Sequence, residues 1–216
     1  MPIRLRLPNA TNLSKTNDED PVEYYYRPLT GRFYRRRLEM ALTMLGDRRF
    51  EHALEIGCGS GIFLPALCER ARLVSAFDRH DNMGLVLAML RQEGLQCNLW
   101  TGDALSISVP DETFDAVICL SVLEHLAGSQ LERAIAEIKR VSRPGAALVL
   151  GFPCRNVITD TFYRVFGFSP RSIHPSSHEI IRRAVVDRLD IEESCLFVPW
   201  LPAFLNVYNV YLCTRT

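Results

Sequence analysis

The sequence predicts an α/β fold with a doubly wound, seven-stranded, mostly parallel sheet that ends in a C-terminal antiparallel hairpin. Short apolar runs alternate with helix-like segments from residue 53 to residue 152, a pattern typical of a parallel sheet covered by helices on both faces. Near the C-terminus two strand-like segments, 189–200 and 206–216, follow each other without a helix between them. With 216 residues, of which 48% are apolar, the chain is large enough to bury one substantial core.

The strands and helices of this fold can be placed in order along the chain. Expected strands occupy residues 53–57, 72–78, 96–103, 114–120 and 146–152. Expected helices occupy residues 62–70, 82–93 and 130–142. The last of these is amphipathic, and Pro144-Gly145 should stop it before the fifth strand. Upstream, the spacing of apolar residues predicts a helix that starts after Gly31 and carries Arg35–Arg37 on its polar face.

We divide the chain into an N-terminal arm and lid helix, residues 1–45, and one main domain, residues 46–216. The alternation of strands and helices lapses at about residues 153–190, which should form an insertion at the strand ends, where loops commonly carry function. Within it, Ser176-x-x-Glu179 fits a capping box that opens a helix. Residues 195–213 carry no charge, but their prolines favour two buried strands over a membrane span.

Composition and charge argue against several classes of protein. The chain has 25 Lys and Arg and 25 Asp and Glu. Its net charge is therefore zero, and it has no overall positive electrostatic potential that would attract nucleic acid. Seven scattered cysteines without a C-x-x-C pair fit neither a disulfide framework nor a zinc site, and they suit a reducing cytoplasm. The N-terminal residues lack the apolar core of a signal peptide. We therefore expect a cytoplasmic protein that does not bind nucleic acid.

The most informative motif is EIGCGSG at residues 55–61, directly after the first expected strand. Glycines there allow a sharp turn and a close approach of the backbone to a ligand, and the following helix points its positive end toward that ligand. A dinucleotide fingerprint, G-x-G-x-x-G, would need glycine at position 62, where this chain has Ile62. Glu55, two positions before the first glycine, also suits a cationic group better than a pyrophosphate.

Three further strand ends carry residues that an adenosine-containing ligand requires. Asp78 ends the second strand, where a carboxylate can bind two ribose hydroxyls, although a helix N-cap is an alternative role. Asp103 follows the third strand and can accept from an adenine amino group, unless it is a plain turn residue. Leu120 and Ser121 end the fourth strand. Separate structural roles would not explain why these residues fall in register on successive strand ends.

This combination closely resembles the class I S-adenosylmethionine-dependent methyltransferases, in the small-molecule group that includes the ubiquinone and menaquinone biosynthesis enzymes. The resemblance is strong over residues 50–152, and it implies a Rossmann-like fold with S-adenosyl-L-methionine as the cofactor. It implies that Glu55 and the glycine loop hold the methionine part of the cofactor, Asp78 the ribose and Asp103 the adenine. Met83 matches a position that often packs on the adenine ring, with ordinary core packing as its alternative. The expected cofactor-binding residues are Glu55, Gly57, Cys58, Gly59, Gly61, Asp78, Arg79, Met83, Asp103, Ala104, Leu120 and Ser121.

Two histidines are the candidate catalytic residues. His125 follows the fourth strand and can take a proton from a substrate hydroxyl near neutral pH, or else it frames the cofactor together with Glu124. His174 lies before the capping box, where the resembling family often places a histidine near the methyl acceptor. We expect no metal, because the ubiquinone-pathway enzymes have a glutamate where this chain has Ser121, which leaves the metal-binding set incomplete.

The expected function is methyl transfer to an oxygen, or else a nitrogen or carbon, of a small and fairly apolar metabolite. One alternative is a cofactor-binding partner subunit without catalysis. Another is a membrane-peripheral lipid methyltransferase that uses the Arg32–Arg37 face. We also expect Tyr24–Arg27 and the insertion to close over the cofactor as a lid, the alternative being that residues 1–30 form a tail that contacts nothing.

Overall fold

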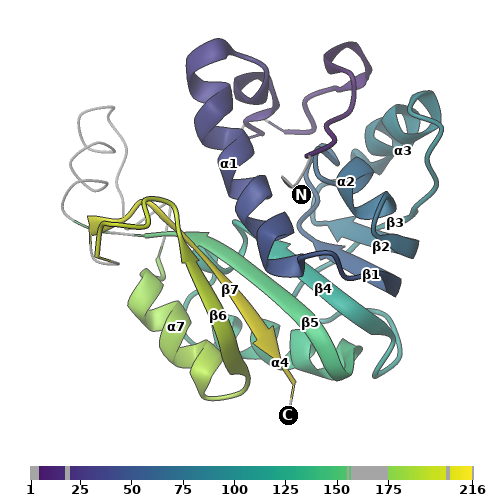
Figure 1. The fold of residues 1–216 in the computed structure, drawn as a ribbon. Helices are drawn as coiled ribbons and strands as arrows, with labels where there is room; N and C mark the ends of the chain where they lie inside the picture. Colours follow the sequence, from purple (N-terminus) through teal and green to yellow (C-terminus); the bar gives the residue numbers. More distant parts are fainter. Residues whose placement is uncertain (1–4, 18–19, 155, 157–174, 203–204, 216) are drawn as a thin grey trace.

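The computed structural model describes residues 5–17, 20–154, 156, 175–202 and 205–215. Seven strands in these ranges form one sheet in the order β3-β2-β1-β4-β5-β7-β6 (Figure 1). The strands are β1 (Phe50–Ile56), β2 (Ala71–Asp78), β3 (Asn98–Thr101), β4 (Phe114–Leu120), β5 (Ser142–Pro153), β6 (Asp190–Leu196) and β7 (Tyr208–Thr214). Neighbouring strands from β3 to β5 are parallel, whereas β7 runs antiparallel to both β5 and β6. The predicted sheet with its C-terminal antiparallel hairpin is confirmed.

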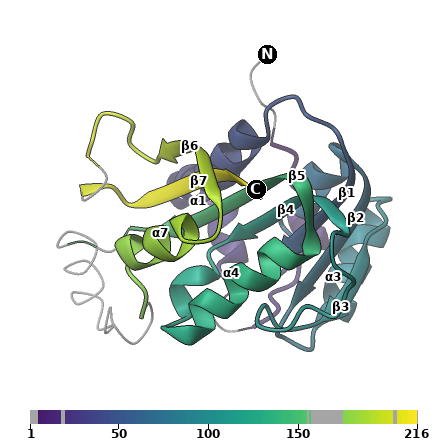
Figure 2. The ribbon, with the colours of Figure 1, turned by 90° about the horizontal axis from the view of Figure 1, so that it is seen from below.

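Helices cover both faces of the sheet. The described helices are α1 (Pro28–Leu45), α2 (Leu64–Cys68), α3 (Met83–Gln92), α4 (Ser129–Val141) and α7 (His178–Val186), with short 3-10 helices η1 (Ala10–Asn12), η2 (Val22–Tyr25) and η3 (Leu123–His125). Figure 2 shows α4 and α7 in front of the sheet and α1 behind it. Helices α1, α2 and α3 pack into one core, and α4 and α7 pack into the other.

The central strands contribute side chains to both cores in turn. In β4, Ala116 and Ile118 belong to the core of α1, α2 and α3, whereas Val117 and Cys119 belong to the core of α4 and α7. Successive side chains of a strand point to opposite faces of its sheet. A strand buried on both faces therefore needs apolar residues at every position, which explains the continuous apolar runs in the sequence.

Helix α1 begins at Pro28, before the predicted start after Gly31. Proline is favoured at the first helical position because its missing N–H would have no helical partner there. Gly31 therefore lies inside the helix, where an added Cβ would come within 2.5 Å of Tyr25 O. The absence of a side chain at Gly31 lets η2 pack closely against α1. Arg36, expected on a polar face, instead donates from Nε to Phe197 O (3.1 Å).

The N-cap of α7 is Ser177 rather than the predicted Ser176. The Ser177 hydroxyl accepts from the Ile180 N–H (3.4 Å). Ser176 is buried, and its hydroxyl donates to the carbonyl of Leu126 in the loop after η3. The predicted capping box is therefore wrong by one residue. The hydroxyl of Ser176, which the sequence pattern assigned to the helix N-terminus, instead forms a tertiary hydrogen bond with Leu126, and Ser177 caps the helix.

The uncharged stretch 195–213 contains the end of β6, a connection and most of β7, so the two strands are confirmed. Only β7 is buried as predicted, because β6 lies at the edge of the sheet and its residues are exposed or half-buried. The buried side chain of Asn206 holds this connection together. Its Oδ1 accepts from the Val198 N–H (3.0 Å), and its Nδ2 donates to Val198 O (2.8 Å) and Leu201 O (3.3 Å). Among the helices of the described ranges, none is long and apolar enough to cross a membrane.

Candidate active site

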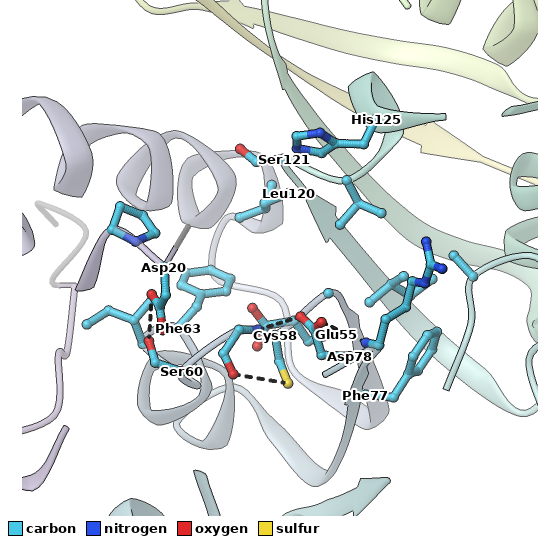
Figure 3. Close-up of a pocket in the computed structure, with 18 of the residues that line it drawn as sticks. Asp20, Glu55, Cys58, Ser60, Phe63, Phe77, Asp78, Leu120, Ser121 and His125 are labelled. Carbon is cyan, nitrogen blue, oxygen red and sulfur yellow. Dashed lines mark hydrogen bonds between the residues drawn. The ribbon is translucent and has the colours of Figure 1, made fainter. Parts of the chain in front are cut away.

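The carboxyl ends of β1, β2 and β4 border a pocket of about 470 Å³ (Figure 3). In the view of Figure 3, Leu120, Ser121 and His125 lie along the upper side, with Glu55 and Asp78 below them. The pocket is lined by Asn17, Asp20, Pro21, Tyr25, Arg37, Leu38, Glu55, Ile56, Gly57, Cys58, Gly59, Ser60, Ile62, Phe63, Phe77, Asp78, Arg79, Asp103, Ala104, Leu120, Ser121, Val122, His125, Leu126 and Tyr208. Adjacent parallel strands with diverging connections open such a crevice at their carboxyl ends.

The glycine loop after β1 forms one wall of this pocket. Gly57 (φ 74°) and Gly59 (φ 51°) both have the left-handed backbone that favours glycine. An added Cβ at Gly57 would come within 2.3 Å of Val122 Cγ2, so Gly57 lets the loops after β1 and β4 approach each other. An added Cβ at Gly59 would meet no atom of the described residues within 4 Å. The pocket side of the Gly59 Cα therefore leaves room for a ligand to approach the loop closely.

Asp78 fixes the glycine loop from the end of β2. Its Oδ2 accepts from the Gly59 N–H (2.8 Å), and its Oδ1 accepts from the Arg79 N–H (2.7 Å). Each carboxylate oxygen can accept more than one hydrogen bond. Asp78 can therefore hold the loop and still bind two neighbouring hydroxyl groups in the pocket. Asp103 also lines the pocket, and its Oδ1 accepts from the Leu105 N–H (2.9 Å).

Glu55 is a buried carboxyl group with an unsatisfied oxygen. Only 5% of the residue is exposed, and Oε2 has no hydrogen-bond partner in the described part of the chain. Burial, with a further contribution from the nearby charge of Asp78, raises the pKa of Glu55 well above its ordinary value. A buried carboxylate is costly unless it is paired. Glu55 therefore fits a cationic ligand group, such as the ammonium of an amino acid.

Arg37 of α1 brings a positive charge to the same pocket. Its Nη1 donates to Ser121 Oγ (3.3 Å) and its Nη2 donates to Tyr25 Oη (3.2 Å). The guanidinium lies 4.7 Å from the ring centre of Tyr34 and 5.4 Å from that of Tyr208. Its buried Nε has no hydrogen-bond partner among the described residues. The sequence placed Arg37 on an outward polar face, and this prediction is wrong because the face packs against η2 and β7.

Ser121 has a strained backbone at the end of β4. Its φ of 58° is unusual for a residue other than glycine. The Ser121 N–H donates to Gly151 O (2.7 Å), and its hydroxyl lies 3.0 Å from the hydroxyl of the buried Tyr208. These contacts hold a polar group in a pocket wall that also contains apolar Leu120 and Val122.

His125 lines the pocket from η3, whereas its neighbour Glu124 does not. Glu124 is 1% exposed, and burial raises its pKa to about 8. Because a carboxyl of raised pKa holds its proton more tightly in the folded state, its contribution to stability is complete below about pH 4.5 and is lost as the pH rises to about 8. In the described ranges, no three His, Cys, Asp or Glu side chains are grouped so as to hold a metal ion.

Two predicted site residues within the described ranges, Gly61 and Met83, are not among those that line the pocket. Gly61 (φ 77°) lies where an added Cβ would come 2.7 Å from Val86 Cγ1, so it allows close packing against α3. Met83 packs against the core beneath α3, which is the alternative that the sequence left for it. His174 lies outside the described residues.

Several pocket residues were not predicted as part of the site. Tyr208 and Leu126 had no recognisable motif. Asn17 and Asp20 come from the N-terminal arm, where the sequence predicted lid residues at Tyr24–Arg27; of that segment, Tyr25 lines the pocket. The alternative of a tail that contacts nothing is wrong, since Asn82 Nδ2 donates to the carbonyl of Thr16 (2.7 Å) and the arm lines the pocket.

Comparisons with known proteins agree on one family. Residues 54–150 match the methyltransferase domain family. The chain is 34% identical over 111 residues to the malonyl-[acyl-carrier protein] O-methyltransferase of Serratia marcescens, covering 51% of this chain and 42% of that protein. It is 26% identical over 144 residues to the ubiquinone biosynthesis O-methyltransferase of Coxiella burnetii, covering 63% of this chain and 58% of that protein. These matches support a class I S-adenosylmethionine-dependent methyltransferase domain over residues 54–150.

The fold of this chain has a close counterpart among solved structures. The N-methyltransferase NodS from Bradyrhizobium japonicum, in complex with S-adenosyl-L-homocysteine, superposes with a TM-score of 0.70 at 22% identity, covering 94% of this chain and 95% of NodS. The chain spans only about half the length of the two curated relatives. Residues 54–150, which match the domain family, contain the glycine loop and the ends of β1, β2 and β4 that line the pocket.

Proposed function

We propose that this methyltransferase transfers a methyl group from S-adenosyl-L-methionine to a nucleophile of a small and fairly apolar metabolite, with oxygen as the favoured nucleophile. The observation that carries the proposal is the buried carboxyl oxygen of Glu55, which has no hydrogen-bond partner among the described residues and lies in a pocket that Gly59 of the glycine loop also lines. Together they form a ready site for a cationic amino acid moiety joined to a nucleoside. Oxygen is favoured because the two curated relatives described above are named O-methyltransferases.

The residues of the pocket have complementary roles in this proposal. Glu55 accepts from the ammonium of the methionine moiety, and Arg37 supplies the positive charge for its carboxylate. Asp78 accepts from the ribose hydroxyls while it holds Gly59 (2.8 Å). Asp103 accepts from the adenine amino group. Cys58, Arg79, Ala104, Leu120 and Ser121 complete the walls around the cofactor.

The cofactor, when bound, supplies an electrophilic methyl group on a sulfonium. The protein then has to align the acceptor nucleophile with that methyl group and exclude water, since positioning alone supplies a large part of the rate enhancement in such displacements. Val122 and Leu126 offer an apolar surface for the acceptor. His125, exposed at the pocket wall, accepts the proton of a hydroxyl acceptor.

Two measurements test the proposal in sequence. Calorimetry should detect binding of S-adenosylmethionine and S-adenosylhomocysteine but not of NAD, because the dinucleotide glycine is absent at Ile62. A screen with a tritiated methyl donor against a library of small metabolites should then yield a labelled product. Folded protein that binds neither methyl compound, or that binds NAD more tightly, contradicts the cofactor assignment. Binding without transfer to any acceptor favours the catalytically silent partner subunit.

Methyl transfer to lipids at a membrane surface is a second candidate, favoured by an exposed apolar cluster. Leu29 of α1 is 90% exposed and Trp200, after β6, is 83% exposed. The same two segments meet where the rings of Phe33 and Phe197 pack with centroids 4.8 Å apart. The guanidinium of Arg36 lies 5.6 Å from the Phe197 ring centre, so the cluster carries a positive charge suited to an anionic lipid surface.

Vesicle co-sedimentation separates this candidate from a protein that acts in solution. The lipid candidate predicts binding to phosphatidylglycerol vesicles that is lost in the double variant Leu29→Ser, Trp200→Ser. The matched control is Ile180→Ser with Val186→Ser, which removes exposed apolar residues from α7. Equal binding of both double variants, or no binding of the unaltered protein, contradicts the lipid candidate.

A further inference from the structure

Two cysteines that are 29 residues apart in the sequence meet in the folded protein. Cys68 is the last residue of α2, and Cys97 directly precedes β3. Their sulfur atoms lie 3.5 Å apart. Both side chains are half-buried, and neither lines the pocket. This pair could not be predicted from the sequence, because its two cysteines do not have C-x-x-C spacing.

We propose that Cys68 and Cys97 form a reversible dithiol–disulfide site that is oxidised by a small-molecule disulfide such as oxidised glutathione. A disulfide bond requires the sulfurs to approach to about 2.05 Å. They must therefore move closer by roughly 1.5 Å from their separation of 3.5 Å, a shift that rotation of two side chains at the ends of α2 and β3 can supply. The proposal does not depend on the methyltransferase reaction.

The surroundings of the pair favour Cys68 as the sulfur that reacts first. A hydrogen bond from the Cys97 thiol lowers the pKa of Cys68, and the nearby charge of Arg6 lowers it further. The same hydrogen bond and burial raise the pKa of Cys97. The thiolate is the nucleophile in disulfide exchange. Cys68 therefore provides the nucleophile and Cys97 the thiol that completes the exchange.

The other cysteines are less suited to this reaction. Cys58, Cys119, Cys154 and Cys213 are buried, and burial raises the pKa of each. Cys195 is half-buried, and burial raises its pKa too. Its sulfur contacts the carbonyl of Leu196 (3.9 Å). A mild disulfide reagent should therefore select the Cys68–Cys97 pair over these five.

The reaction is balanced in two exchange steps. The Cys68 thiolate attacks one sulfur of oxidised glutathione, which forms a mixed disulfide and releases one reduced glutathione. The Cys97 thiol loses its proton and attacks the Cys68 sulfur, which forms the internal disulfide and releases the second reduced glutathione. The protein loses two electrons and two protons, and the two glutathione molecules receive them.

The disulfide would join two elements that support the pocket. Helix α2 follows the glycine loop, and β3 leads to Asp103. Cross-linking residues about 30 positions apart restricts the unfolded chain, so oxidation should stabilise the fold. For a protein of this size we expect the Tm to rise by roughly 5–10 °C. Reduction with dithiothreitol should restore the original Tm.

Peptide mapping of the folded protein after incubation with oxidised glutathione tests the proposal. The expected result is one cross-linked peptide pair containing Cys68 and Cys97, the loss of two titratable thiols and the rise in Tm. Glutathione that stays attached to Cys68, thiols that remain unreacted, or an unchanged Tm in the cross-linked protein would overturn it.

Matched variants make the assignment specific. Cys68→Ser and Cys97→Ser should each abolish both the internal cross-link and the rise in Tm. Cys195→Ser removes another half-buried thiol and should leave both unchanged. A rise in Tm that persists in Cys68→Ser would show that oxidation acts elsewhere, and it would overturn the proposal even if that variant is less stable.

Discussion

Replacing Asp78 with alanine should weaken cofactor binding without unfolding the protein. The Asp78 carboxylate accepts from the Gly59 N–H at 2.8 Å and from the Arg79 N–H at 2.7 Å, and it faces the pocket. Asp78→Ala removes the acceptors that we assign to the ribose hydroxyls and leaves the Gly59 N–H without its partner. Both effects reduce the affinity for a ligand that lies against the glycine loop.

The magnitude follows from the charge of the acceptor. Hydrogen bonds to an ionised group contribute about 1.5–3 kcal/mol, and water that enters the vacated space offsets part of the loss. We expect a net loss of about 1–3 kcal/mol in binding free energy, which weakens the affinity roughly 5-fold to 150-fold. Isothermal titration calorimetry with S-adenosylhomocysteine measures this difference directly, without a known methyl acceptor.

Asp115→Ala is the matched control for this experiment. Asp115 Oδ2 accepts from the Glu51 N–H (2.7 Å) and Oδ1 accepts from the His52 N–H (2.8 Å). Like Asp78, it therefore holds a backbone segment, here the start of β1, through two hydrogen bonds. It does not line the pocket. The reasoning is refuted if Asp78→Ala binds within about two-fold of the unaltered protein. An equal loss in Asp115→Ala refutes it as well, because a loosened strand would then explain both variants.

Four further predictions follow from the same structure. The stability of Glu124→Gln relative to the unaltered protein, measured by urea unfolding, should rise by about 1.4 kcal/mol per pH unit between about pH 5 and pH 8. Over that range Glu124 must take up a proton when the unaltered protein folds, because burial raises its pKa to about 8 whereas the unfolded carboxyl is already ionised; a pH-independent difference contradicts this. Gly61→Ala should lower the stability by about 2–4 kcal/mol, since a positive φ and a contact of 2.7 Å with Val86 both oppose a Cβ, and an unchanged urea midpoint would exclude that packing role. Asp20→Ala should weaken S-adenosylhomocysteine binding several-fold, because Asp20 orders the arm that lines the pocket and lies 3.5 Å from the Ser60 hydroxyl; unaltered affinity would show that the arm is not a lid. A metal chelator should leave the rate of methyl transfer unchanged, and a loss of activity that magnesium restores would contradict this prediction.

The glycine loop and the strand-end acids could be predicted because each is encoded by neighbouring residues. Glu55, Gly57 and Gly59 lie within five positions, and an apolar run shows which strand they follow. Parallel strands bring their carboxyl ends to one edge of the sheet, so Asp78 joins this group through the topology alone. The family resemblance rests on the same short segments.

Other parts of the site depend on packing between distant segments. Arg37 meets Ser121, 84 residues away, and Ser121 meets Tyr208, 87 residues away. A helical pattern shows which residues share a face, but the elements packed against that face decide whether an arginine there meets water or a pocket. The same reason explains why Ser176 donates to the loop after η3 and leaves the helix cap to Ser177.

Local pattern was thus sufficient for the class of fold, the order of its strands and helices, and the part of the pocket that follows β1 and β2. Its physical basis is the periodicity of buried side chains and the special backbone of glycine, both of which act over a few residues. The charge of Arg37 in the pocket, the contribution of Asn17 and Asp20 to its lining and the Cys68–Cys97 pair were visible only after folding. Each depends on a distance between segments far apart in the chain, which is set by how complete helices and strands pack together.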